Sequence, residues 1–130
     1  MKLKSVRRGT WQVLAACTGR GECPLLDFLA GLEGDLAPDG RRMLRLFERV
    51  ATAGPPRNTE ISHQIEGEIW ELIQGRLRVL WFYDQGRMVV CSHGFVKSSP
   101  KTPRGELVRA RETLWNYQSA KRRSAMEILP

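Results

Sequence analysis

Residues 70–110 decide the fold of this chain, and they read WELIQGRLRVLWFYDQGRMVVCSHGFVKSSPKTPRGELVRA. Apolar runs rich in β-branched and aromatic residues predict strands at residues 69–73, 76–84 and 87–96. The turn residues Gln74-Gly75 and Asp84-Gln85-Gly86 separate these runs. We therefore expect the three strands to pair consecutively as antiparallel hairpins.

The middle of these strands is predicted to be covered on both of its faces. Side chains alternate across a strand, so neighbouring residues point to opposite sides of the sheet. One face then carries Arg76, Arg78, Leu80 and Phe82, and the other carries Leu77, Val79, Trp81 and Tyr83. Apart from the arginines both faces are apolar, which is typical of a central strand.

The segments on either side of this sheet complete an α+β domain. Alternating apolar residues predict a short strand at residues 10–17. A helix should begin at Pro24 and end near Gly34, and a second should run over residues 38–53, so that the two form a helical hairpin. Composition and length indicate one domain over residues 1–130, with a loose or strand-like tail at 124–130.

A third helix is predicted after the basic loop at residues 97–101. Thr102 can cap its N-terminus and Pro103 can occupy its first position, because proline lacks the N–H that this position leaves unpaired. The helix should reach about Ala120. Its buried stripe is expected to contain Leu107, Ala110, Leu114 and Tyr117.

Positive charge is concentrated in the C-terminal half. The formal net charge is +7, yet residues 1–75 sum to zero, whereas residues 76–123 carry eleven Lys or Arg against three acidic residues. This asymmetry favours a nucleic-acid or phosphate-rich partner. A basic surface that serves only solubility is the alternative.

The cysteines and histidines give no clear metal signature. Three cysteines without CxxC spacing are typical of reduced thiols, so we expect a cytoplasmic protein with no cofactor and no membrane segment. A zinc site built from Cys17, Cys23, His63 and His93 is an alternative, although ligand spacing does not support it.

Several cations should converge at one edge of the sheet. In an antiparallel hairpin the start of the middle strand lies beside the end of the next strand, which brings Arg76 and Arg78 near residues 95–97. Cations at fixed positions are what a nucleic-acid backbone requires. His93 is a candidate general base, although a histidine on the apolar face of Val89, Cys91 and Phe95 is more often a packed core group.

The order of these residues resembles toxins of the RelE/HigB superfamily, in the phage-derived branch of toxin–antitoxin toxins. The carrying motifs are GEIWEL (residues 67–72), GRLRVL (75–80), HGF with Lys97 (93–97), and Lys101-Thr102-Pro103 followed by Glu106 and Ala110. The resemblance spans residues 63–121, while residues 1–62 are only compatible with it.

The resemblance implies a RelE-like α+β fold, in which an N-terminal strand and a helical hairpin pack on a mostly antiparallel sheet with a C-terminal helix. It implies ribosome-dependent, metal-independent cleavage of mRNA through attack of the 2′-hydroxyl, and a cognate antitoxin, expected to be a helix-turn-helix protein. Arg78 and Lys97, with Arg76, match the catalytic cations. Further RNA contacts are expected from Lys101, Arg104, Arg111, Lys121, Arg122 and Arg123.

Two positions depart from the family pattern. Ile73 and Ser98 stand where the family commonly has cations, and fewer cations should slow phosphoryl transfer. The alternative function is therefore a non-catalytic member that binds nucleic acid or inhibits gyrase.

Overall fold

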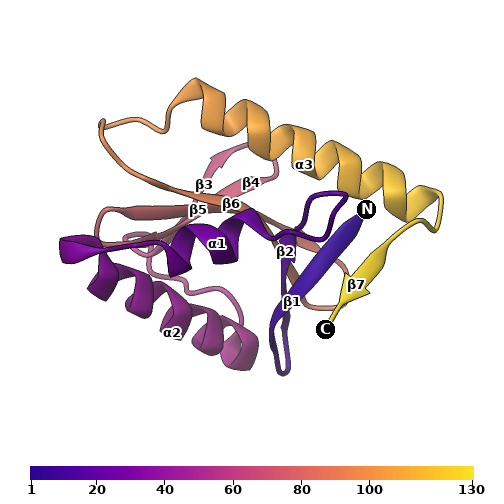
Figure 1. The fold of residues 1–130 in the computed structure, drawn as a ribbon, viewed down its shortest axis with the longest axis horizontal. Coiled ribbons are helices and arrows are strands. Elements are labelled where there is room, and N and C mark those ends of the chain that lie inside the picture. The colour runs from indigo at the N-terminus through magenta and orange to yellow at the C-terminus, as the bar shows by residue number, and fades with distance from the viewer.

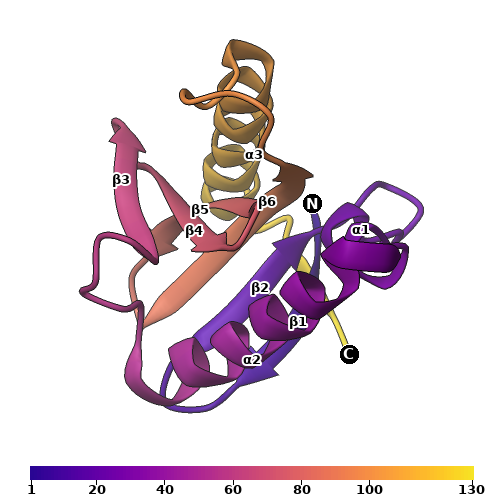
Figure 2. The same ribbon diagram turned by 90° about the vertical axis from the view of Figure 1, so that its left-hand side faces the viewer.

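Three helices enclose a seven-stranded open sheet in the computed structural model, which describes residues 1–130 (Figure 1). Helix α3 covers one face of the sheet, while α1 and α2 cover the other (Figure 2). The strand order is β3-β4-β5-β6-β2-β1-β7. The predicted α+β class with a mostly antiparallel sheet is confirmed. None of the helices has the length and apolar character needed to cross a bilayer.

The strands are β1 (Lys2–Arg8), β2 (Gln12–Ala16), β3 (Ser62–Glu66), β4 (Ile69–Gln74), β5 (Leu77–Asp84), β6 (Met88–Val96) and β7 (Glu127–Leu129). The helices are α1 (Pro24–Ala30), the short 3-10 turn η1 (Gly34–Leu36), α2 (Ala37–Ala53) and α3 (Arg104–Arg122).

The predicted pairing of β4, β5 and β6 is confirmed. Both pairs are antiparallel, and the register places Trp70 opposite Trp81 and Arg78 opposite Phe95. The N–H of Lys97 donates to the carbonyl of Arg76 across 2.7 Å, which extends the ladder into the loop after β6. The start of β5 and the end of β6 therefore lie side by side, as the hairpin geometry requires.

Strand β5 lies between the two cores of the molecule. Leu77, Val79 and Trp81 belong to the cluster under α1 and α2, whereas Leu80 and Phe82 belong to the cluster under α3. The predicted assignment of these faces is confirmed. Burial of large side chains on both faces makes β5 the strand on which packing of the other elements depends.

Two of the seven strands, β1 and β3, were not predicted, and the tail that was predicted to be loose or strand-like contains a strand. The basic N-terminus forms β1, which pairs with β2 and β7; residues 62–66 form the edge strand β3; and the C-terminal tail is the strand β7. In β1 the buried Leu3 lies between Lys2 and Lys4, which are half-buried. None of these strands has an apolar run of its own. Strands β1 and β3 form hairpins with the strands that follow them, and β7 pairs with β1 from the other end of the chain.

The predicted face of His93 is wrong, because β6 contains an irregularity. Leu80 pairs with His93, but the next residue, Trp81, pairs with Cys91, so Ser92 is an additional residue in β6. This extra residue moves His93 to the α3 face, with Phe95, and leaves Val89 and Cys91 on the opposite face.

The predicted start of α3 is also wrong by one position. The helix begins at Arg104, Pro103 is its N-cap residue, and no side chain caps it. The Thr102 hydroxyl instead donates to the Glu71 carboxylate across 2.9 Å. A charged acceptor competes successfully for this hydroxyl because charge-assisted hydrogen bonds are the stronger ones.

The turn between β4 and β5 is held against the first turn of α2. Gly75 has a φ of +57°, and a Cβ at this position would collide with the Asp39 carboxylate. That carboxylate accepts hydrogen bonds from the Arg76 N–H and from the Arg42 guanidinium, at 3.3 and 2.8 Å. Only glycine allows this close approach at a positive φ.

We expect Gly75→Ala to destabilise the protein more than Gly67→Ala, a matched control in the β3–β4 turn. Gly67 has a φ of +56° with no atom near its missing Cβ, so its substitution isolates the backbone cost of about 1 kcal/mol. Gly75→Ala should cost about 1 kcal/mol more, because the Asp39 hydrogen bonds must break. Urea unfolding measures both; equal losses would contradict the role of the close approach.

Candidate functional site

A cleft of about 440 Å³ opens on the α3 face, between β3, β4 and β5 and the loop after β6. Its apolar part includes Phe95 and Leu107. Its charged part contains the cations Arg78, Lys97 and Lys101 and the carboxylates Glu66 and Glu71. His63 also lines the cleft. The cleft thus collects opposite charges beside apolar walls, an arrangement typical of binding and catalytic sites.

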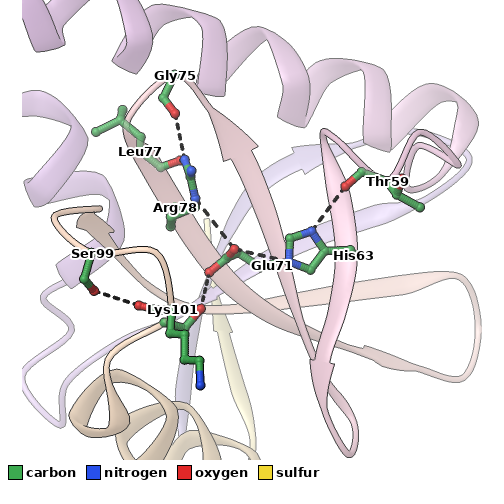
Figure 3. A network of polar contacts seen from close by, with 9 residues as sticks. Thr59, His63, Glu71, Gly75, Leu77, Arg78, Ser99 and Lys101 are labelled. Atoms are coloured by element: carbon green, nitrogen blue, oxygen red, sulfur yellow. Dashed lines mark hydrogen bonds and ion pairs between the residues drawn. The ribbon is translucent and has the colours of Figure 1, made fainter.

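Glu71 lies at the centre of the polar part. Its side chain comes from β4 and is only 5% exposed, so its charge needs partners inside the protein. Oε2 accepts the Thr102 hydroxyl at 2.9 Å, while Oε1 lies 3.6 Å from Arg78 Nε and 3.5 Å from His63 Nε2 (Figure 3). Three separate segments therefore meet at one carboxylate.

Arg78 holds a fixed orientation beside this carboxylate. Its Nη1 donates to the carbonyls of Gly75 and Leu77, at 2.7 and 2.9 Å, and the side chain is 9% exposed (Figure 3). Its buried Nε has no hydrogen-bond partner in the protein. The guanidinium is thus anchored through Nη1, while Nη2 makes no hydrogen bond within the protein.

His63 approaches Glu71 from the edge strand β3. Its Nδ1 lies 3.2 Å from the Thr59 carbonyl, which can only accept, so Nδ1 carries a proton (Figure 3). Its Nε2 lies 3.5 Å from Oε1 of Glu71. His63 is 36% exposed, so a ligand can reach the ring.

The basic loop supplies the other two cations of the cleft. Lys97 is half-buried and Lys101 is exposed, and both line the cleft without a carboxylate partner. The Ser99 hydroxyl donates to the Lys101 carbonyl across 2.8 Å, which orders the loop locally (Figure 3). The structure therefore brings together Arg78, Lys97 and Lys101 among the cations that the sequence indicated.

The remaining predicted cations lie outside this group. Arg76 is exposed in the turn before β5 and does not line the cleft. Arg104 and Arg111 both form ion pairs with Glu66, so α3 is tied to β3 through a carboxylate at the cleft. Much of their charge is compensated within the protein.

The last three predicted cations lie at the far end of α3. Lys121 Nζ binds both oxygens of Asp84, at 2.8 and 3.0 Å. Arg122 donates to the Ser119 hydroxyl and Arg123 to the Ser119 carbonyl, at 3.3 and 3.4 Å. None of the three lines the cleft.

His93 does not line the cleft either. It is 1% exposed, its Nδ1 lies 2.8 Å from the Ser92 hydroxyl, and its Nε2 lies 3.2 Å from Glu106. Burial, aided by the Arg109 charge, lowers the pKa of His93, although Glu106 acts in the opposite direction. Because the ring is buried and does not reach the cleft, this position does not support a role of His93 as a general base.

Sequence reasoning missed Glu71 and Thr102 and gave little weight to His63. The signal was present in the strand periodicity, since Glu71 is a carboxylate within an apolar run. Recognising its partners required β3, which was not predicted.

Of the two departures from the family pattern, Ile73 lines the cleft but Ser98 does not. The four residues of the alternative zinc site do not gather into a metal-binding cluster.

Fold and site together define a small α+β protein with a cleft in which three cations and two carboxylates lie beside apolar walls. Residues 28–114 match the model of the family described as Phage derived protein Gp49-like (DUF891). The chain belongs to this family, which is associated with toxins of toxin–antitoxin systems of the RelE/HigB kind. No curated protein matches the chain.

The contact between Lys121 and Asp84 should make the stability of the fold depend on pH. Burial acts to raise the pKa of Asp84, but hydrogen bonds from Lys121, Tyr117 and the Gln85 N–H outweigh it, so this pKa lies below its usual 3.8. The contact therefore stabilises the fold above pH 3.8 and is lost as the pH falls through the lowered pKa. Asp84→Asn should cost about 1–3 kcal/mol at pH 7 and less at pH 3, by urea unfolding. A cost independent of pH would contradict this account.

Proposed function

We propose that this protein is a toxin of a type II toxin–antitoxin system that cleaves mRNA on the ribosome. The observation that carries the proposal is the meeting of Glu71, Arg78 and His63 in a cleft flanked by Lys97 and Lys101. Membership of the Gp49-like family supports a toxin-like role. These groups are those that metal-independent cleavage of RNA by its own 2′-hydroxyl requires.

In this reaction the 2′-oxygen attacks the adjacent phosphorus. A new bond joins the 2′-oxygen to phosphorus, and the bond from phosphorus to the 5′-oxygen of the next nucleotide breaks. The products are a 2′,3′-cyclic phosphate and a 5′-hydroxyl. One group must take the proton of the 2′-hydroxyl, another must give a proton to the departing 5′-oxygen, and cations must stabilise the charge on the phosphoryl oxygens.

Glu71 and His63 suit the two proton transfers. The Glu71 carboxylate can accept the 2′-hydroxyl proton, and the Thr102 hydroxyl fixes its orientation through Oε2. The His63 imidazolium, with Nδ1 engaged by Thr59, can give its Nε2 proton to the leaving oxygen. Because acid and base are adjacent, the proton can pass back between them after each turnover.

Arg78 and the two lysines suit stabilisation of the phosphoryl oxygens. The guanidinium is already oriented by two backbone carbonyls, so little reorganisation is needed when negative charge develops. Lys97 and Lys101 are unpaired cations on the same cleft and can hold the flanking phosphates. The ribosome would position the mRNA against this cleft, and an acidic antitoxin segment would neutralise it.

A non-catalytic member of the same family, which binds nucleic acid or inhibits gyrase, is the second candidate. The specific observation in its favour is Ile73, an apolar residue inside the cleft where related toxins carry a cation. Mapping the 5′ ends of transcripts after brief induction separates the two functions. New ends inside translated codons support cleavage, whereas their absence supports the non-catalytic role.

We expect induction of the wild-type protein in bacteria to halt growth, and the Arg78→Ala/Lys97→Ala double variant to restore it. Removal of two cations from the reacting phosphate should lower cleavage by about 10³-fold or more. The Arg41→Ala/Arg45→Ala variant is a matched control, because it removes the same charge from exposed positions of α2 and should remain toxic.

Circular dichroism establishes that the variants fold. The Arg78 side chain has buried hydrogen-bond partners, so its loss could prevent folding, whereas the Lys97 side chain has none. If the double variant does not fold, growth arrest is therefore measured with Lys97→Ala alone. Growth arrest by a folded double variant would refute the proposed cleft.

A second prediction concerns the base. Glu71→Gln keeps the size of the side chain and its acceptor for Thr102, yet it cannot take a proton at neutral pH. Cleavage of a translated mRNA in a purified translation system should fall about 10²- to 10⁴-fold. Thr102→Val, which removes only the positioning contact, should have a much smaller effect. Full cleavage by Glu71→Gln would assign the proton transfer to another group.

A further inference from the structure

A second groove, of about 530 Å³, lies on the other face of the sheet. Three aromatic side chains from different strands or turns line it, namely Trp11, Trp70 and Tyr83. The Tyr83 ring lies 6.0 Å from that of Trp11 and 5.6 Å from that of Trp70, with the Trp70 contact edge-to-face. Tyr83 is 43% exposed, whereas Trp11 and Trp70 are partly buried and pack against the core, so the cluster presents ring surface to the groove from a fixed base.

The aromatic groove is formed before any ligand arrives. The backbone N–H of Trp11 donates to the Ala51 carbonyl at 2.8 Å, which attaches the β1–β2 turn to the end of α2. Gly54, at a φ of +85°, leaves room for the Trp11 ring, since a Cβ there would lie 2.8 Å from it. Trp70 packs against the buried Trp81 ring at 5.5 Å. Rings held in this way lose little conformational freedom on binding.

The groove has one fixed cation and no carboxylate, so its charge does not oppose a polyanion. Arg57 and His63 line it, and no aspartate or glutamate does. At its floor the Ser62 residue is 3% exposed, and its hydroxyl has no hydrogen-bond partner in the protein. An unpaired buried hydroxyl is costly, so a polar edge of a ligand that reached it would recover that cost.

The groove is continuous with the cleft around the edge strand β3. His63 and Gln64 line both of them, although the cleft opens on the α3 face and the groove on the opposite face. Figure 2 shows β3 at the outer edge of the sheet, with no element beyond it. A single nucleic-acid strand can therefore pass around this edge with a phosphate on one side and a base on the other.

We propose that the aromatic groove is a nucleobase-binding subsite, which holds an unpaired base of the RNA that flanks the phosphate in the cleft. The inference rests on the proposed function for the identity of the ligand, but it concerns binding and not cleavage. Stacking on aromatic rings is the general mode by which proteins hold single-stranded bases. The subsite would select among RNA sequences by the base that stacks best on the exposed ring surface of this aromatic cluster.

The test uses the purified protein and labelled hexaribonucleotides of each base, with 2′-O-methyl groups that block cleavage. Anisotropy measures the affinity, and quenching of tryptophan fluorescence reports stacking. We expect Trp70→Ala or Tyr83→Ala to weaken binding about 5- to 100-fold. Tyr83→Phe keeps the ring and should bind like the wild type, which separates stacking from a loss of structure.

An abasic nucleotide placed at each position in turn locates the bound base. One position should weaken binding to the wild type, and the same substitution should have no effect on Tyr83→Ala, because the stacked pair is then already lost. A loss of binding affinity that depends both on the aromatic ring and on the position of the abasic nucleotide supports the subsite.

Absence of binding to all four oligonucleotides, or binding indifferent to both alanine variants, would overturn the inference. Binding of a proline-rich peptide in place of the oligonucleotides would also overturn it and would assign the groove to a protein partner. None of these outcomes bears on the growth and transcript assays, so a failure here is distinguishable from a failure of the proposed function.

Discussion

Burial of the Glu71 carboxylate is the constraint on which the rest of the site depends. A buried charge is tolerated only when it is paired and hydrogen-bonded, and removal of one partner leaves a charge that the interior cannot stabilise. The partners of Glu71 come from β3, β5 and the loop before α3. This carboxylate therefore fixes the edge strand, the central strand and the start of the last helix relative to one another, and the cleft is the space that they leave.

The sequence predicts the centre of the fold better than its edges, for a physical reason. Strands β4, β5 and β6 carry their own apolar pattern, and hairpin geometry then fixes their register. Strands β1 and β3 are polar, and β7 is only three residues long; β1 and β3 pair with the next strand of the chain, and β7 pairs with β1 from the opposite end. Their stability comes from neighbours, which local propensity cannot indicate. The irregularity at Ser92 cannot be predicted from the sequence for the same reason, because it appears only in the pairing of β6 with Leu80 and Trp81.

The candidate site, too, could be predicted from the sequence only in part. Register alone places Arg78 beside the start of the basic loop, so Arg78, Lys97 and Lys101 were accessible to sequence reasoning. Glu71 and His63 were not, because their meeting requires β3 to pair with β4. Sequence reasoning also treats every cation as free. The ion pairs of Arg104 and Arg111 with Glu66, and of Lys121 with Asp84, follow from the tertiary structure alone.

Ile73 changes how the cleft must work if it stabilises a phosphate. A cation at this position would add charge, whereas an apolar side chain beside Arg78 and Glu71 can reduce their contact with water. At about 4 Å, two unit charges interact by about 1 kcal/mol in water and by about 4 kcal/mol at an effective dielectric constant of 20. Exclusion of water can therefore strengthen the Arg78 contact by as much as a further exposed lysine would contribute. The site then relies on one oriented guanidinium in a partly dry cleft, and the loss of that single group should be correspondingly severe.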